Sequence, residues 1–186
     1  MLIKKRSFFQ KKLQRPSRSS RPSTKTSTGS SRYKQGQYIL KNPHTYIGDI
    51  TNIYYRSSWE LLFFRWIDML SGKENSPIIA WNSEEVKIPY FFKLDNKYHT
   101  YYIDIAMKYR SGNGDIISCL VEIKPHAQTI CPVLPKKQTP KATQNYTYRM
   151  FEYQKNQAKW EAATKYCETN NMEFKIITEY ELGLKK

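Results

Sequence analysis

A turn signal between two apolar runs is the feature that most constrains how this chain can fold. The segment GNGD at residues 112–115 contains Asn-Gly and Gly-Asp steps, which are typical of tight hairpin turns. Before it a strand is predicted at about 98–109, in which Ile103, Ile105 and Met107 alternate with Tyr102, Asp104 and Ala106, and after it a further strand is predicted at about 116–123. The pattern predicts an antiparallel hairpin with Asp104 on the face opposite its two isoleucine neighbours.

Further periodic segments surround this hairpin. Apolar residues recur at helical spacing over about 57–70, and a second helix is predicted at about 148–169. Strands are predicted at about 86–92 and 174–178, while the Pro-rich segment 125–141 is expected to be a loop or lid. The order helix, three strands, helix, strand predicts an α/β domain with a central mixed sheet flanked by helices.

Positive charge is concentrated at the N-terminus. The 186-residue chain has a formal net charge of +15, and residues 1–36 hold 11 Lys or Arg and no acid. Residues 37–186 hold 20 basic and 16 acidic residues, a net of +4. The first segment is rich in Ser, Thr and Pro and buries too little apolar surface to fold alone. We therefore expect a disordered or partner-ordered basic arm at 1–36 and one globular domain at 37–186.

The basic arm has three interpretations that its sequence leaves open. It can bind phosphates of a nucleic acid, it can become ordered against a protein partner, or it can be a mitochondrial transit peptide. Phosphate binding would weaken steeply with salt, whereas docking through its apolar residues would not. Under the first interpretation the contacts come from its densest basic cluster, which comprises Lys4, Lys5, Arg6, Lys11 and Lys12.

Patterns of several other classes of protein are missing. No run of 18 apolar residues and no secretory leader is present, so no membrane association is expected. The three cysteines, Cys119, Cys131 and Cys167, have no zinc-site spacing and are expected to be free thiols. No recognition-helix motif supports a sequence-specific regulator.

Asp104, Glu122 and Lys124 combine the side chains that phosphodiester hydrolysis needs. Glu122 and Lys124 are two residues apart on a predicted strand and so share a face, across the hairpin from Asp104. Two close carboxylates repel each other unless a cation lies between them, and their hard oxygens suit Mg²⁺, which also binds phosphate. The lysine can then orient a water or stabilise charge at phosphorus. The alternative is a surface ion pair, and this motif alone is a weak signal.

Residues beside this set have open roles. Ser57 and Glu60 fit a capping box at a helix start, yet Glu60 also flanks the apolar face and can project toward a cleft as a metal ligand. Lys155 and Lys159 are expected on the outer face of the second helix, where they are either solvated or in contact with DNA.

Read together, five ordered segments resemble the head-completion nucleases of tailed bacteriophages, a PD-(D/E)XK family related to the endonuclease subunit of certain transposases. The resemblance covers about residues 33–184 and implies a restriction-endonuclease-like core. The segments are KNPHTYIGDITNIYYRSSWE at 41–60, WNSEEVKIPY at 81–90, YYIDI at 101–105, VEIKPHAQT at 121–129 and NQAKWEAATKYCETNNMEFKIITEYELG at 156–183.

The resemblance also implies a site. Glu60, Asp104, Glu122 and Lys124 match the catalytic positions, and the three acids among them match the metal ligands, with Mg²⁺ as the cofactor and Mn²⁺ as a substitute. The backbone carbonyl after Glu122 is a further candidate ligand. The residues that flank Asp104 depart from the family pattern, because isoleucines stand where a proline and an aromatic residue are usual.

The function implied is a metal-dependent endonuclease that acts on double-stranded DNA in head completion, after DNA packaging and at or near the portal vertex. Arg56 and the arm would contact phosphates, and the arm would also bind portal or neck proteins. The protein would be found in the virion at the head-neck vertex, and in the host cytoplasm during assembly. The alternative is a structural neck protein that binds the portal and the packaged DNA end without essential catalysis. The oligomeric state is left open.

Overall fold

The structure, a computed structural model, describes residues 35–185. The expected arm at 1–36 lies almost entirely outside the described residues, together with the five basic side chains assigned to it. No helix in the described part of the chain is both long and apolar enough to cross a membrane. The three cysteines are free thiols, as expected.

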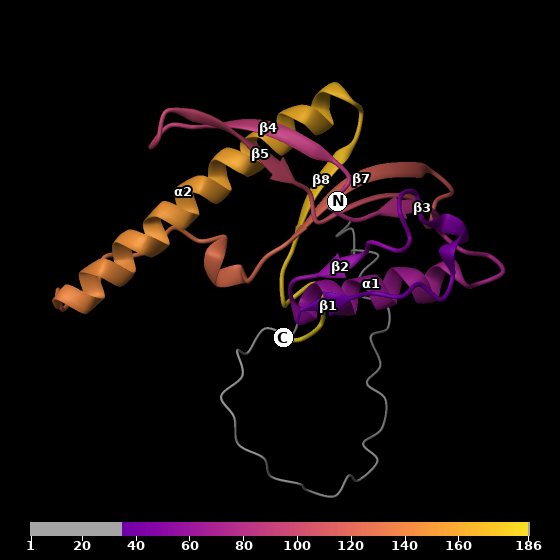
Figure 1. Cartoon of the computed structure of the whole chain (residues 1–186), viewed down its shortest axis with the longest axis horizontal. Coiled ribbons are helices and arrows are strands. Elements are labelled where there is room, and N and C mark those ends of the chain that lie inside the picture. The colour runs from indigo at the N-terminus through magenta and orange to yellow at the C-terminus, as the bar shows by residue number, and fades with distance from the viewer. Residues whose placement is uncertain (1–34, 186) are drawn as a thin grey trace, which may run out of the picture.

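A four-stranded mixed sheet forms the centre of the domain (Figure 1). Its strands follow the order β3-β6-β7-β8, with antiparallel pairs except for the parallel pair β7 and β8. The strand bounds are Ile78–Asn82 for β3, Ile105–Arg110 for β6, Ile116–Ile123 for β7 and Glu173–Ile177 for β8. The β6–β7 hairpin confirms the predicted turn at 112–115.

Two helices cover the two faces of this sheet. Helix α1, Ser58–Ser71, packs against the odd-numbered residues of β7 through Phe63, Phe64 and Ile67. Helix α2, Pro140–Thr169, packs against the even-numbered Leu120 through Trp160, Ala163 and Cys167. Alternate residues of a strand point to opposite faces, so each helix has its own apolar core. The predicted α/β architecture with a mixed sheet flanked by helices is confirmed.

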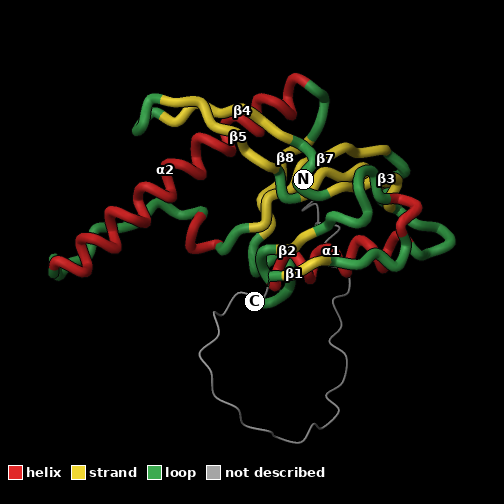
Figure 2. The backbone as a smooth tube through the Cα atoms, viewed as in Figure 1, coloured by secondary structure: helices red, strands yellow, loops and turns green. Residues whose placement is uncertain are grey.

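A second, two-stranded ribbon extends from the central sheet beside α2 (Figure 2). Strands β4, Lys87–Phe92, and β5, Lys97–Tyr102, pair antiparallel and place their buried side chains in the α2 core. The remaining elements are short: β1 Gly36–Gln37, β2 Tyr54–Tyr55, and 3-10 turns η2 Pro43–Thr45 and η3 His126–Gln128.

The single strand expected at 98–109 is wrong, because the chain bends between β5 and β6. Ile103 exchanges backbone hydrogen bonds with the segment before β4, donating to Val86 at 3.0 Å and accepting from Glu84 at 3.1 Å. Ile103 therefore lies in the α2 core, whereas Ile105 lies in the α1 core. The expectation that Asp104 faces away from both isoleucines is wrong for the same reason.

Two other boundaries differ from the predictions. Strand β3 was not predicted, and its Trp81 belongs to the core. Helix α2 begins at Pro140, eight residues before the predicted start, so the expected loop at 125–141 is shorter. Thr139 caps the helix by accepting the N–H of Ala142, and proline suits the first helical turn because it needs no N–H partner there.

Candidate active site

The candidate catalytic residues meet at the edge of the sheet where β6 begins and β7 ends. The register pairs Ile105 with Val121, which places Asp104 opposite Glu122 one residue further on. Asp104 Oδ2 accepts a 2.7 Å hydrogen bond from the backbone N–H of Ile123. This bond holds the aspartate carboxylate against the last residue of the neighbouring strand.

The Glu122 carboxylate is held through both of its oxygens. Glu122 is only 1% exposed. Its Oε1 lies 2.7 Å from Nζ of Lys124, and its Oε2 accepts a 2.6 Å hydrogen bond from the hydroxyl of Tyr101. Glu122 and Lys124 both follow Leu120 in alternation, so the carboxylate and the ammonium lie on the α2 face.

Negative charge exceeds positive charge where Asp104, Glu122 and Lys124 meet. Burial raises the pKa of Asp104 well above its ordinary value, and repulsion by Glu122 raises it further. Burial alone would lower the pKa of Lys124, but Glu122 and Asp104 outweigh that effect and raise it. Two partly desolvated carboxylates share one ammonium, so a cation with hard oxygen preference would relieve the repulsion. The residues present therefore fit a divalent metal at Asp104 and Glu122.

Glu60 acts as a helix cap in this structure. Its Oε1 accepts from the Ser57 hydroxyl at 2.8 Å, its Oε2 accepts from the Arg56 N–H at 2.7 Å, and its own N–H donates to Ser57 Oγ. The capping interpretation is confirmed. No group of three His, Cys, Asp or Glu side chains that could hold a metal occurs within residues 35–185. Glu60 nevertheless contributes to the raised pKa of Asp104, so its charge acts on the site.

Arg56, expected to contact DNA, pairs with an acid beside the site. Its guanidinium approaches the Glu84 carboxylate at 2.9 and 3.1 Å, and 69% of its side chain is exposed. Glu84 donates its backbone N–H to Ile103, directly before Asp104. Arg56 is thus anchored close to the candidate site with its side chain open to solvent.

The sequence did not single out Tyr101 as a site residue, and it left Lys159 either solvated or in contact with DNA. Tyr101 is buried beneath the site, and Nζ of Lys159 lies 5.2 Å from the centre of its ring. Burial lowers the pKa of Lys159, and the positive charge of Lys124 lowers it further. The expectation of a solvated outer face is therefore wrong for Lys159, which comes from α2 into the site. No local pattern signals this, because the contact depends on where the β4–β5 ribbon places Tyr101.

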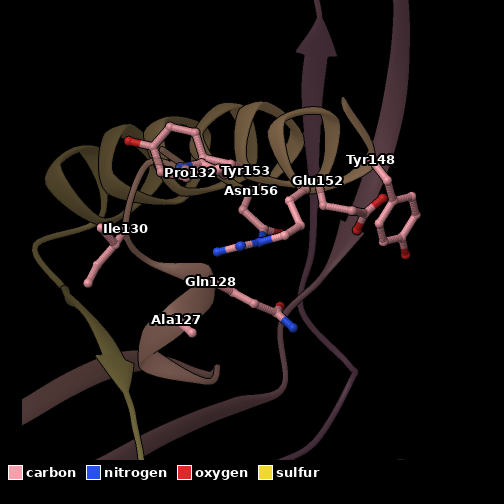
Figure 3. A pocket seen from close by; sticks show the side chains of 9 residues that line it. Ala127, Gln128, Ile130, Pro132, Tyr148, Glu152, Tyr153 and Asn156 are labelled. Carbon is pink, nitrogen blue, oxygen red and sulfur yellow. The ribbon is translucent and has the colours of Figure 1, made fainter. Parts of the chain in front are cut away.

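The segment after Lys124 turns back against the end of the chain. The backbone N–H of His126 donates to Glu179 at 2.8 Å, and the His126 ring lies edge-on to Tyr180 with centroids 5.0 Å apart. Beyond η3 the chain runs along α2, and the two enclose a pocket of about 100 Å³ (Figure 3).

A mixed sheet flanked by helices, with a carboxylate pair and a lysine at one edge, is the arrangement that the sequence led us to expect of an endonuclease. The chain belongs to the TnsA-like endonuclease N-terminal family, whose sequence profile matches residues 75–179. The matched region contains Asp104, Glu122 and Lys124 but not Glu60.

A relative supports the same class. The chain is 38% identical over 144 residues to the head completion nuclease of Enterobacteria phage T4. The aligned region covers 77% of this chain and 90% of the relative. The resemblance to head-completion nucleases inferred from the sequence is confirmed. No solved structure matches the chain.

Proposed function

We propose that this protein is a divalent-metal-dependent DNA endonuclease that acts in phage head completion. The observation that carries the proposal is the Glu122 carboxylate, held between Tyr101 and Lys124 and opposite Asp104. A buried pair of like charges is costly in a protein that has no use for it, and such pairs are typical of metal-assisted hydrolysis. The T4 relative is named a head completion nuclease, which supports the same biological step.

Each residue of the site has a proposed role. Asp104 and Glu122 hold the cation, Mg²⁺ or in its place Mn²⁺, with the Ile123 carbonyl as a further oxygen donor. When bound, the cation supplies charge stabilisation to the phosphate oxygens and acidifies water. Lys124, oriented by its 2.7 Å contact with Glu122, positions the attacking water and stabilises charge that develops at phosphorus.

Tyr101, on β5, and Lys159, on α2, are the two remaining residues of the proposed site. Tyr101 positions Glu122 by donating a hydrogen bond to Oε2 of its carboxylate. The bond fixes the orientation of the carboxylate, so that its remaining lone pairs can face the cation. Lys159 forms no ion pair with a carboxylate of the described residues, yet the charges of Lys124 and Glu122 act on it. We assign it the contact with a non-bridging oxygen of the scissile phosphate.

Glu60 remains a proposed site residue. Each oxygen of its carboxylate already accepts one hydrogen bond in the cap, and we propose that it acts on the cation through an intervening water or through its charge. Double-stranded DNA is the proposed substrate, with phosphate contacts from Arg56 and from the arm residues named above. We further propose that the arm binds portal or neck proteins, which would place the protein at the head-neck vertex after assembly in the host cytoplasm.

Plasmid nicking tests this function. Purified protein is incubated with supercoiled DNA and Mg²⁺, Mn²⁺ or EDTA, beside Lys124→Ala and the matched surface variant Lys108→Ala. Nicking that needs the metal and is lost only in Lys124→Ala supports the endonuclease. Retained DNA binding without cleavage under either metal would instead favour the structural neck protein.

A further inference from the structure

The net positive charge of the domain comes from one segment, which follows the active site in the chain. Residues 125–160 hold six Lys or Arg and one acid, whereas the rest of residues 37–186 holds 14 basic and 15 acidic residues. The segment runs from η3 to the middle of α2 and therefore begins next to Lys124. A strand of DNA that leaves the cleavage site along α2 meets a basic track, whereas the remaining surface is electrically neutral.

A pocket lies within this track. It has a volume of about 100 Å³ and is enclosed between α2 and the segment after η3 (Figure 3). Asn156 reaches it from α2 and Gln128 from the opposite side. Tyr148, Tyr153 and Pro132 add flat apolar surface to its walls.

Asn156 is the residue that marks the pocket as a binding site. It is only 4% exposed, but its amide is not among the fully enclosed side-chain atoms that lack a partner within residues 35–185, so the small accessible part of this side chain faces the pocket that it lines. A largely buried amide that faces a pocket usually binds a ligand or an ordered water there. Asn156 lies one helical turn from Lys159, so whatever it binds lies close to the proposed phosphate contact.

A nucleobase suits the amide and aromatic side chains that line this pocket. Amide side chains donate and accept hydrogen bonds in the same plane as the edge of a base, and aromatic rings stack on the face of any base. The exposed guanidinium of Arg149, also part of the lining, can hold the phosphate attached to that nucleotide. An apolar ligand would leave Asn156 and Gln128 unpartnered, and a free phosphate would lie against the acid Glu152 and unused aromatic surface.

We propose that this pocket binds the base of an unpaired nucleotide beside the scissile phosphate. A base that is stacked and paired within a duplex cannot enter, so the nuclease selects DNA that has an unpaired nucleotide, such as a frayed end, a flap or a bulge, over continuous duplex. This inference rests on the proposed nuclease function, because it assigns the substrate structure to that site.

The test compares two fluorescently labelled duplexes of equal length, identical except that one carries a single unpaired adenosine. Binding by the full chain is measured by anisotropy in EDTA, so cleavage does not enter. We expect wild-type protein to bind the bulged duplex about tenfold more tightly, the effect of one stacked base. Asn156→Leu, which keeps the side-chain size, should remove that preference and leave the affinity for paired duplex within about twofold. Lys165→Ala, at an exposed position near the far end of α2, should keep the preference.

Two further variants keep the test decisive if Asn156→Leu folds poorly. Gln128 and Arg149 are exposed, so Gln128→Ala and Arg149→Ala do not disturb the core, and each should reduce the preference for the bulged duplex. Equal affinity of wild-type protein for the two duplexes, or a preference that survives all three variants, would overturn the proposal that the pocket binds a base. Metal-dependent nicking without any preference contradicts the pocket alone, whereas a preference without nicking contradicts the nuclease proposal alone.

Discussion

The buried hydroxyl of Tyr101 donates a 2.6 Å hydrogen bond to the carboxylate of Glu122. Burial and the adjacent negative charge of Glu122 both raise the pKa of Tyr101, so the hydroxyl keeps its proton at neutral pH. The tyrosine comes from the β4–β5 ribbon and the glutamate from the central sheet. The bond therefore ties the ribbon to the catalytic edge.

Removing that hydroxyl should impair catalysis more than binding. In Tyr101→Phe one oxygen of Glu122 is left without its donor, and we expect kcat to fall about tenfold with little change in KM, as for other residues that orient a metal ligand. The matched control is Tyr98→Phe, because Tyr98 is 77% exposed on the same strand. Equal loss in both variants, or a change confined to KM, would contradict the positioning role.

Lys159 should contribute one phosphate contact that Lys165 does not. Lys159→Ala is expected to lower cleavage by about tenfold to a hundredfold and to reduce the slope of log affinity against log salt by about one. Lys159→Arg should restore part of both, because it keeps the charge. Lys165→Ala, exposed on the same helix, serves as the control. An unchanged salt slope in Lys159→Ala would remove the residue from the DNA contact.

The two roles of Glu60 can be separated with its capping partner. Ser57→Ala removes the hydroxyl that receives the Glu60 N–H, and should lower the free energy of unfolding by about 1 kcal/mol while cleavage persists. Glu60→Gln is expected to abolish most cleavage at a similar stability cost. Stability is measured by urea unfolding and cleavage by nicking. Full activity in Glu60→Gln would reduce the residue to a cap.

The raised pKa of Asp104 predicts how stability depends on pH. The folded chain holds this proton more tightly than the unfolded chain, so ionisation of Asp104 lowers stability as the pH rises from the ordinary value of 3.8 through the folded pKa. Above that window, metal-free Asp104→Asn should be more stable than wild type by about 0.5–2 kcal/mol. The difference should shrink below pH 3.8, where both chains are uncharged at this position. Thermal unfolding in EDTA across this range checks the sign.

Local signals were enough to predict the hairpin but not the site in full. The β7 bounds agree with the prediction at both ends, because the turn and the apolar run are encoded side by side. Glu122 and Lys124 share a face for the same local reason. The bend at Asp104 was invisible, since Ile103 and Ile105 are both buried but on different faces.

Long-range contacts account for the rest. Helix α2 was predicted too short because its first turns carry no apolar stripe and touch the core only further along. Lys159 lies on α2 and Tyr101 on β5, so no spacing in the sequence predicts the contact between them. Neither residue could be assigned to the site without the position of the β4–β5 ribbon beside α2.

Metal binding at Asp104 and Glu122 is the property on which the proposed nuclease mechanism depends. Isothermal titration with Mn²⁺ compares wild-type protein, Asp104→Asn, and Asp115→Asn, whose exposed acid lies in the hairpin turn of the same sheet. We expect wild type and Asp115→Asn to bind the ion with similar affinity and to nick plasmid DNA, whereas Asp104→Asn should lose both properties and keep its fold. Undiminished Mn²⁺ binding and nicking in Asp104→Asn would contradict it.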